Sequence, residues 1–119
     1  MNSLLLVAHG SRREQSNEEV RLLAKKLKHR CAEQFPIIHA GFLELADPLI
    51  PDGLQKCIDD GASQITVLPY FLNTGRHVAE DIPGIVEEFK QNTSVDINIA
   101  THLGASEMML DLLASVAVQ

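Results

Sequence analysis

Hydrophobic positions occur along the chain in two patterns, short apolar runs and longer stretches in which they recur at helical spacing. Four apolar runs predict buried strands at residues 4–8, 37–44, 64–70 and 95–100. An amphipathic stretch after each run predicts helices at residues 14 to about 34, 47–61, 76–90 and 106–116. Repeated strand–helix units form parallel sheets with helices on both faces. We therefore expect an α/β fold, a single flavodoxin-like doubly wound domain over residues 1–119 with a four-stranded parallel sheet.

Prolines, glycines and one aspartate set the expected ends of these helices. Pro36 is expected to end the first helix. Asp47 and Pro48 predict an N-cap and a first-turn proline for the second helix, and Gly61 marks its end. Pro83 is unfavourable in the interior of the third helix, which predicts either a later start or a kink.

The apolar side chains of the last predicted helix need a surface to pack against. Their spacing predicts contact either with the core or with another copy of the chain, through Met108, Met109, Leu112, Leu113 and Val116. Cys31 and Cys57 fall at apolar positions of predicted helices. We expect buried free thiols there rather than a disulfide or a metal pair.

The composition narrows the classes of function. The chain has a net charge of −6, with 45% hydrophobic and 22% charged residues, as in ordinary globular proteins. A general nucleic-acid binder would show a basic face, so no nucleic-acid partner is expected. No stretch reaches the roughly 18 apolar residues of a membrane span, and the N-terminal sequence lacks the features of a signal peptide. We expect a cytoplasmic protein without a membrane partner.

Arg76 stands out in the acidic second half of the chain. From Gly61 onward the basic residues are Arg76 and Lys90, against seven acidic ones. The guanidinium of Arg76 could hold an anionic group of a substrate through its fork of donors. The alternative is a surface ion pair with Glu80.

Four loops are expected at one edge of the sheet. Parallel strands end at the same edge, and open α/β sheets bind ligands in the crevice beyond it. Such a sheet brings His9, Glu44, the segment 73–77 and His102 to that edge. His9 and His77 could converge there on one metal ion or one proton-transfer centre.

The first two of these loops each carry a possible role and an ordinary alternative. His9 leads into Gly10, Ser11 and Arg12, where glycine permits close backbone approach and the following groups can bind an anion. The alternative is a plain strand–helix turn. Glu44 can complete a metal site of two histidines and one carboxylate, or it is a solvated loop acid.

The segment after the third strand offers amide, hydroxyl, guanidinium and imidazole groups, on Asn73, Thr74, Gly75, Arg76 and His77. Tyr70, Phe71 and Leu72 directly before it predict an apolar wall beside these groups. This combination is typical of a site for a large ligand with a flat apolar body and charged edges. The alternative is a capped polar loop with Thr74 as N-cap and His77 on the helix surface.

Three motifs occur in order along nearly the whole chain. They are Leu6-Val7-Ala8-His9-Gly10-Ser11-Arg12, Gly41-Phe42-Leu43-Glu44, and Pro69-Tyr70-Phe71-Leu72 followed by Gly75-Arg76-His77-Val78 and Asp81-Ile82-Pro83. Together they resemble the short sirohydrochlorin chelatases of the CbiX type. The resemblance implies the chelatase fold, an association of two short subunits, and insertion of a divalent ion into the tetrapyrrole sirohydrochlorin.

The resemblance also implies residue roles. His9 and His77 would be the catalytic and metal-binding histidines, with Glu44 assisting. The metal, Co²⁺, Fe²⁺ or in some members Ni²⁺, would be a substrate rather than a permanent cofactor, in cobalamin or siroheme biosynthesis. The family often carries a Pro-Leu-Gly run after the fourth strand. Here that segment is Thr101-His102-Leu103-Gly104, so the resemblance supports no ligand role for His102.

Metal insertion requires the loss of two pyrrole protons at the centre that receives the ion, and imidazoles can both bind the ion and accept protons. We expect the substrate to meet the residues around the two histidines: Ser11, Arg12, Tyr70, Phe71, Leu72, Asn73, Thr74, Gly75 and Arg76. Two alternatives are a non-catalytic metal or tetrapyrrole carrier with the same ligands, and a phosphoryl-transfer enzyme that uses His9. For the latter, Ala8 stands where histidine phosphatases carry an arginine.

Overall fold

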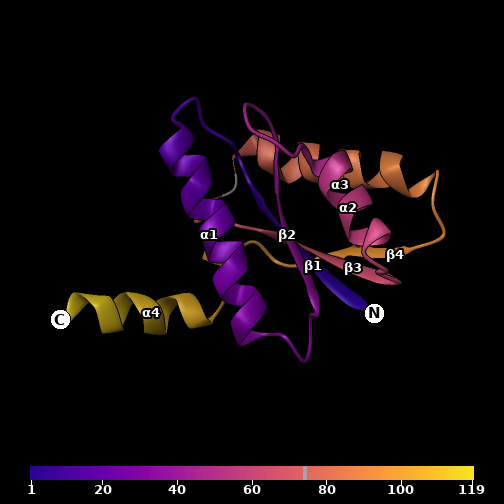
Figure 1. Ribbon diagram of the computed structural model, residues 1–119. Coiled ribbons are helices and arrows are strands. Elements are labelled where there is room, and N and C mark those ends of the chain that lie inside the picture. The colour runs from indigo at the N-terminus through magenta and orange to yellow at the C-terminus, as the bar shows by residue number, and fades with distance from the viewer. Residues whose placement is uncertain (74) are drawn as a thin grey trace.

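The computed structural model describes residues 1–73 and 75–119, with His77 described by its backbone alone. Strands and helices alternate as β1 Asn2–Ala8, α1 Glu14–Arg30, β2 Ile37–Phe42, α2 Ile50–Asp59, β3 Gln64–Pro69, α3 Arg76–Lys90, β4 Asp96–Ile99, a short 3₁₀ helix η1 Leu103–Ala105, and α4 Met108–Ala117. The strands pair in parallel in the order β2-β1-β3-β4 (Figure 1). This confirms the predicted α/β class and four-stranded parallel sheet, and the order is the flavodoxin-like one.

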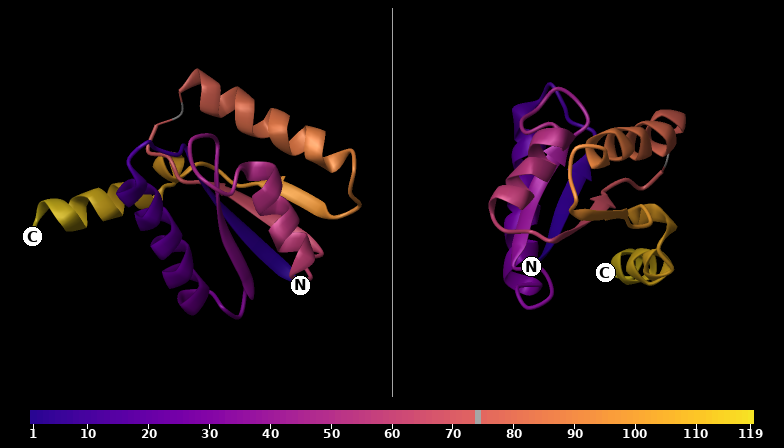
Figure 2. Two further views of the ribbon diagram at one scale, coloured as in Figure 1. Left: turned by 45° about the horizontal axis from the view of Figure 1, so that its top comes forward. Right: turned by 90° about the vertical axis from the view of Figure 1, so that its right-hand side faces the viewer.

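Helices cover the sheet from two sides, with α1 on one face and α2 and α3 on the other (Figure 2). The central strand β1 alternates its side chains between them. Leu5 and Val7 join the core cluster beneath α2 and α3, whereas Leu4 and Leu6 join the cluster beneath α1. A strand buried on both faces is apolar throughout, which explains why residues 4–8 form a continuous hydrophobic run.

Helix α4 stands apart from both layers and runs away from the sheet (Figures 1 and 2). The structure describes all of α4, and none of its residues is buried. Met108 is 69% exposed and Leu113 is 59% exposed. The expectation that this helix packs in the core is therefore wrong, and packing against another copy stays a prediction. Neither α4 nor any other described helix has the length and apolar content needed to cross a membrane.

Strand β2 ends earlier than predicted, at Phe42 rather than Glu44. In a parallel ladder, successive residues direct their backbone groups to opposite sides. Here the N–H groups of the consecutive residues Leu43 and Glu44 both donate toward β1, to the carbonyls of Ala8 and His9 at 3.0 Å. This break in alternation ends the strand and keeps Glu44 beside the end of β1.

The start of α2 also differs from the prediction. The Phe42 N–H donates to the Pro48 carbonyl at 2.8 Å, which places this part of the chain beside β2 instead of in a helix. Asp47 is therefore not the N-cap. Leu49 occupies the cap position, and Pro51 stands in the first turn.

The observed bounds of α1 and α3 differ from those predicted from Pro36 and Pro83. Helix α1 ends at Arg30, four residues before the predicted end, because the backbone leaves helical geometry at Cys31. The Phe35 N–H then donates to the Cys31 carbonyl at 2.8 Å and closes a turn. Helix α3 begins at Arg76 and continues past Pro83, so a late start is wrong.

The two cysteines are free thiols, as predicted, but they differ in burial. Cys57 is fully buried, and this burial raises the pKa of its thiol to about 11. Cys31 is partly exposed at the end of α1. The prediction of a buried thiol holds for Cys57 alone.

Candidate active site

His9 and Glu44 meet at the carboxyl ends of β1 and β2. Nε2 of His9 lies 3.2 Å from Oε1 of Glu44, and the two side chains are 53% and 57% exposed. The strand register pairs Ala8 of β1 with Phe42 of β2, so the residues that follow these two strands come to the same edge of the sheet. The structure therefore brings together two of the three predicted metal ligands.

Gly10 makes the close approach of these two loops possible. Its φ of +95° lies in the left-handed region, which glycine adopts without steric cost. A Cβ at this position would lie 1.7 Å from the Glu44 carbonyl oxygen, so no side chain fits. Leu45, with φ 64°, then turns the chain away from the contact. The predicted close backbone approach at Gly10 is present, and its partner is Glu44.

A buried asparagine holds the loop after His9. Asn17 is 2% exposed; its Oδ1 accepts the Ser11 N–H at 2.9 Å, and its Nδ2 donates to the Ser11 carbonyl at 2.8 Å. The Ser11 hydroxyl accepts the Arg13 N–H at 3.0 Å, while the Arg12 side chain is exposed. Sequence reasoning missed Asn17. The signal that could have found it is a polar side chain at an inward position of an amphipathic helix, since buried polar groups find partners.

Arg21 anchors the far end of the loop between β2 and α2. Its Nη2 donates to the Asp47 carbonyl at 2.7 Å, and its guanidinium lies 5.2 Å from the centre of the Phe42 ring. Ion pairs with Glu14, at 2.6 Å, and with Glu18 hold the arginine in place. Hydrogen bonding to Arg21 lowers the pKa of Glu14, and the same pairing raises the pKa of Arg21.

An acidic cavity of about 760 Å³ opens beside the pair, with α3 as its other wall. Its lining comprises His9, Leu43, Glu44, Glu80, Asp81, Gly84, Ile85 and Glu88. The sequence analysis did not assign the α3 carboxylates to the site. The spacing of Glu80, Gly84 and Glu88, four residues apart, places them on one side of the helix. Such carboxylates attract divalent cations and can ligate them.

His77 lies in the first turn of α3, and its side chain is outside the described residues. Its position precedes Glu80 by three residues and Asp81 by four, which is the spacing of neighbours on one helix face. Thr74 is also outside the described residues. Among the described side chains, no three histidine, cysteine or carboxylate groups lie close enough to hold a metal ion. The three-ligand site with His77 stays a prediction.

The predicted apolar wall divides between two places. Tyr70 and Leu72 are 40% and 65% exposed and line a hollow of about 490 Å³ with Leu103 and α4. Phe71 instead packs against the core cluster beneath α2 and α3. None of these three is among the described residues that line the His9 cavity. Within one chain, the structure does not join this wall to His9.

The polar part of the same segment is open to solvent. Asn73 and Gly75 are exposed, and Gly75 is the N-cap of α3. The Arg76 side chain is 88% exposed, and its Nε lies 3.7 Å from Oε1 of Glu80. The ion pair that was the alternative reading of Arg76 is therefore present. An ion pair this exposed is weak, so the Arg76 guanidinium is still able to bind a ligand.

His102 belongs to a different hollow. It lines an apolar space of about 320 Å³ between α3 and the ends of β3 and β4, together with Val78 and Ile82. Nearby, the Gly104 N–H donates to the Phe71 carbonyl at 2.9 Å, and a Cβ at Gly104 would lie 1.6 Å from the Leu72 carbonyl oxygen. The structure thus brings the loop after β4 against the segment after β3, but does not place His102 in the His9 cavity.

The geometry can perform two kinds of chemistry. An imidazole and a carboxylate 3.2 Å apart can bind one divalent ion, or can share a proton taken from a bound molecule. The acidic wall of α3 favours divalent cations in the same cavity.

Comparisons with known proteins identify the family to which the chain is similar. The CbiX family profile matches residues 3–119. A sirohydrochlorin cobaltochelatase of Methanocaldococcus jannaschii is 43% identical over 91 residues, which are 74% of this chain. A chloroplastic sirohydrochlorin ferrochelatase of Arabidopsis thaliana is 33% identical over 113 residues, which are 94% of this chain. The crystal structure of a cobalamin biosynthesis CbiX protein from Marinobacter aquaeolei VT8 superposes with a TM-score of 0.81 at 26% identity, covering 99% of this chain and 95% of that one.

The matched regions differ in their share of the relatives. This chain spans 62% of the Methanocaldococcus protein and 49% of the Arabidopsis protein. The family profile nevertheless extends over almost all of this sequence, through every strand and helix that forms the fold. The chain belongs to the CbiX family.

Proposed function

We propose that this chain inserts a divalent metal ion, cobalt or iron, into sirohydrochlorin. The observation that carries the proposal is the His9–Glu44 pair at the rim of a cavity whose other wall is acidic. The proposal is supported by relatives that are named sirohydrochlorin cobaltochelatase and sirohydrochlorin ferrochelatase. The metal is a substrate in this reaction.

The first step is capture of the ion. The carboxylates of Glu80, Asp81 and Glu88 give the cavity a negative potential that concentrates divalent cations. Nε2 of His9 and a carboxylate oxygen of Glu44 then supply one nitrogen and one oxygen ligand. His77, one turn before Asp81, would supply the third ligand.

The second step is exchange of protons for metal. The macrocycle loses two pyrrole N–H protons as the dication enters, so charge balances and two protons must leave. An imidazole accepts a proton readily near neutral pH, and the adjacent Glu44 carboxylate stabilises the imidazolium that forms. His9 and His77 would thus release the ion to the ring and take up its protons in the same step.

Substrate carboxylates need donors around the cavity. Arg12 is exposed on the loop after β1, and Arg76 is exposed at the start of α3. Ser11 directly precedes Arg12, and Asn73 lies three residues before Arg76. Arginine binds carboxylates through two parallel hydrogen bonds. These residues would hold the charged edge of the tetrapyrrole while its nitrogens face His9.

We further propose that two copies of the chain associate. The chain spans about half of the Arabidopsis relative. It also presents an apolar surface formed by Tyr70, Leu72 and α4, with Leu112 and Leu113 more than half exposed at 53% and 59%. Covering this surface with a second copy would remove apolar area from water. The wall for the macrocycle would then stand at the interface of the pair.

The alternative functions fit the cavity less well. A phosphoryl-transfer site holds its phosphate group with arginine or lysine, and among the described residues neither lines the His9 cavity. A carrier would use the same ligands as a chelatase, so the two differ by turnover.

The function is tested by following the absorbance of sirohydrochlorin with Co²⁺ or Fe²⁺ and a small molar fraction of the protein. We expect many equivalents of metallated product per chain. The His9→Ala/His77→Ala double variant should lose about 100-fold or more of this rate, because it lacks both imidazoles, and keep its unfolding midpoint.

His29, on the exposed surface of α1, provides the matched control, and His29→Ala should keep the wild-type rate. Product limited to one equivalent per chain would identify a carrier. Near-normal insertion by the double variant would exclude the proposed mechanism.

A further inference from the structure

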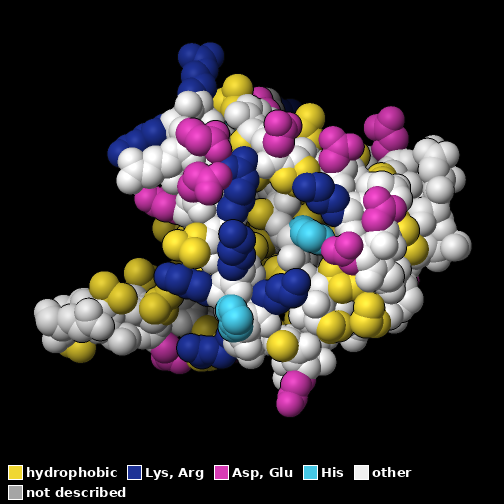
Figure 3. Space-filling view, in the orientation of Figure 1, with side chains coloured by type: hydrophobic (Ala, Val, Ile, Leu, Met, Phe, Trp, Pro, Cys, Tyr) yellow, Lys and Arg dark blue, Asp and Glu magenta, His cyan; other side chains and the backbone are white. Residues whose placement is uncertain are grey.

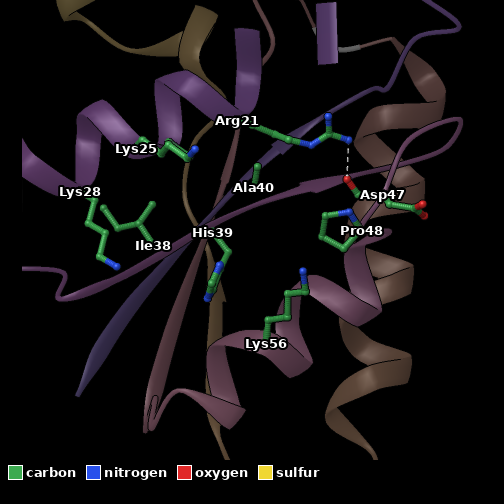
Figure 4. Close-up of a pocket in the computed structure, with 10 residues that line it drawn as sticks. Arg21, Lys25, Lys28, Ile38, His39, Ala40, Asp47, Pro48 and Lys56 are labelled. Carbon is green, nitrogen blue, oxygen red and sulfur yellow. Dashed lines mark hydrogen bonds between the residues drawn. The ribbon is translucent and has the colours of Figure 1, made fainter. Parts of the chain in front are cut away.

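A second polar hollow lies on the opposite side of β2 from the active site, between α1 and α2. We call it the basic groove. It has a volume of about 410 Å³ and is lined by Arg21, Ala24, Lys25, Lys28, Ile38, His39, Ala40, Asp47, Pro48 and Lys56 (Figure 4). It shares no lining residue with the His9 cavity among the described residues. Its volume falls within the range of about 300–1,000 Å³ that is usual for small-molecule sites.

The groove is positively charged in a chain whose net charge is −6. Three of the chain's five lysines line it, Lys25 and Lys28 from α1 and Lys56 from α2. Figure 3 shows lysine and arginine side chains gathered on both sides of a histidine on this face. Such clustering in an acidic chain concentrates anions locally.

The three lysines are the groove's available cations. Within the described residues, no ion pair of Lys25, Lys28 or Lys56 is found, whereas Lys90 pairs with Glu87 at 3.5 Å. The other charges are already matched or opposed. Arg21 is paired with Glu14 and Glu18, His39 lies 2.6 Å from Asp60, and Asp47 contributes one carboxylate. Glu14, Glu18 and Asp60 do not line the groove, so its surface carries four cationic side chains, those of Arg21 and the three lysines, against the one carboxylate of Asp47.

The placement of the lysines and the floor define the ligand. Lys25 and Lys28 stand on one wall and Lys56 on the opposite one (Figure 4), so a molecule that meets both walls needs at least two anionic groups. Ile38 and Ala40 form part of an apolar floor that can contact the body of such a molecule. Lysine ammonium groups bind carboxylates and phosphates alike, as point charges.

We propose that the basic groove binds a small molecule with two or more carboxylate or phosphate groups, at a site separate from the metal centre. The site goes beyond the proposed chelatase activity and does not depend on it. Because the lysines are exposed, each should contribute roughly 1 kcal/mol, as for charges a few ångströms apart in water, which corresponds to about a fivefold change in affinity.

The test is an NMR titration of the full chain with pyrophosphate and, separately, with citrate, at constant ionic strength. The ring signals of His39 and His9 report on the two cavities, and each is assigned through its His→Gln variant. We expect a saturable shift of His39 with His9 unmoved. Saturation with pyrophosphate alone, citrate alone or both supports the site and identifies phosphate, carboxylate or either as its ligand group.

Two double variants with the same charge change complete the test. Lys25→Gln/Lys56→Gln removes one lysine from each wall and should weaken binding about tenfold or more. Lys26→Gln/Lys90→Gln lies outside the groove and should change affinity less than about twofold. The proposal is overturned if neither probe saturates, if His9 shifts instead of His39, or if both double variants weaken binding equally. None of these outcomes bears on metal insertion, which has its own assay.

Discussion

The loops at the carboxyl ends of the strands differ between the two halves of the sheet. In the β1–β2 half, the backbones of His9 and Glu44 are hydrogen-bonded at 3.0 Å, and Gly10 leaves no room between the loops. In the β3–β4 half, Gly104 packs against Leu72, but the chain then leaves the sheet as α4 with its apolar side chains uncovered. The loops of the β1–β2 half are therefore packed within this chain, whereas the β3–β4 half leads to a helix whose apolar side chains are uncovered.

This difference separates the two requirements of a metal-insertion site. Ligands must be held at a fixed spacing, and main-chain contacts in the β1–β2 half provide that for His9 and Glu44. A large flat substrate must enter and leave, and the open apolar surface of Tyr70 and Leu72 suits that need better. We call the β1–β2 half the rigid half and the β3–β4 half the open half. The rigid half would bind the metal ion, and the open half would bind the macrocycle.

The largest effect is expected from a substitution of Gly10 in the rigid half. Gly10→Ala places a methyl group 1.7 Å from the Glu44 carbonyl oxygen at a φ of +95°. We expect a loss of about 3 kcal/mol or more in the free energy of unfolding. Separation of His9 from Glu44 should also lower the insertion rate by about 100-fold. Urea unfolding and the absorbance assay measure the two effects.

Gly75 provides the matched glycine in the open half. Among the described atoms, nothing lies within 4 Å of a Cβ built there, and the φ is −73°. Because Gly75 is the N-cap of α3, where alanine is less favourable than glycine, Gly75→Ala should cost no more than about 1 kcal/mol of stability. Equal losses in the two variants would mean that the halves do not differ in rigidity.

Parallel topology explains why the rigid half could be predicted from sequence. Once the apolar runs before His9 and Glu44 are taken as neighbouring strands, both residues must come to one edge. The α3 carboxylates could not be found this way, because acidic residues at helical spacing are usual on solvated faces. Their position in the cavity depends on the packing of Ile82 and Val86, which turns the opposite face of α3 toward His9.

Two expectations failed because sequence pattern does not identify the surface that covers an apolar residue. Helix α4 is amphipathic whether its partner is the core or another chain, so burial and exposure give the same periodicity. Tyr70, Phe71 and Leu72 lie beyond the end of β3, where strand alternation no longer applies, and they point to different places. The third ligand, His77, stays a prediction because its side chain is outside the described residues.

Smaller effects are expected from two apolar side chains that differ in exposure, Ile82 of α3 and Leu113 of α4. Ile82 is 1% exposed, and Ile82→Ala should cost about 2–4 kcal/mol of stability at any protein concentration. Leu113 is 59% exposed, and Leu113→Ala should leave the dilute protein unchanged within about 0.5 kcal/mol. Urea unfolding at low and high protein concentration measures both.

The same Leu113 variant tests the association of two copies. If a second copy covers α4, Leu113→Ala should weaken self-association, as measured by sedimentation equilibrium, and should destabilise the concentrated protein only. A wild-type chain that stays monomeric at high concentration would rule out the pair. A large loss for Leu113→Ala in the dilute protein would show that α4 is packed within one chain.

The smallest effects come from two arginines, one in each half. Arg21, whose side chain is 25% exposed, joins the Asp47 carbonyl, two glutamates and the Phe42 ring, so Arg21→Ala should cost about 1–2 kcal/mol of stability. Arg76 has one exposed partner at 3.7 Å, and Arg76→Ala should leave the unfolding midpoint unchanged.

If Arg76 holds a substrate carboxylate, the same variant should raise KM for sirohydrochlorin several-fold with kcat nearly constant, because a contact made equally in the ground and transition states affects binding alone. An unchanged KM would remove Arg76 from the substrate site and leave it a surface ion pair. A loss of stability equal to that of Arg21→Ala would show instead that the open half is held as firmly as the rigid one.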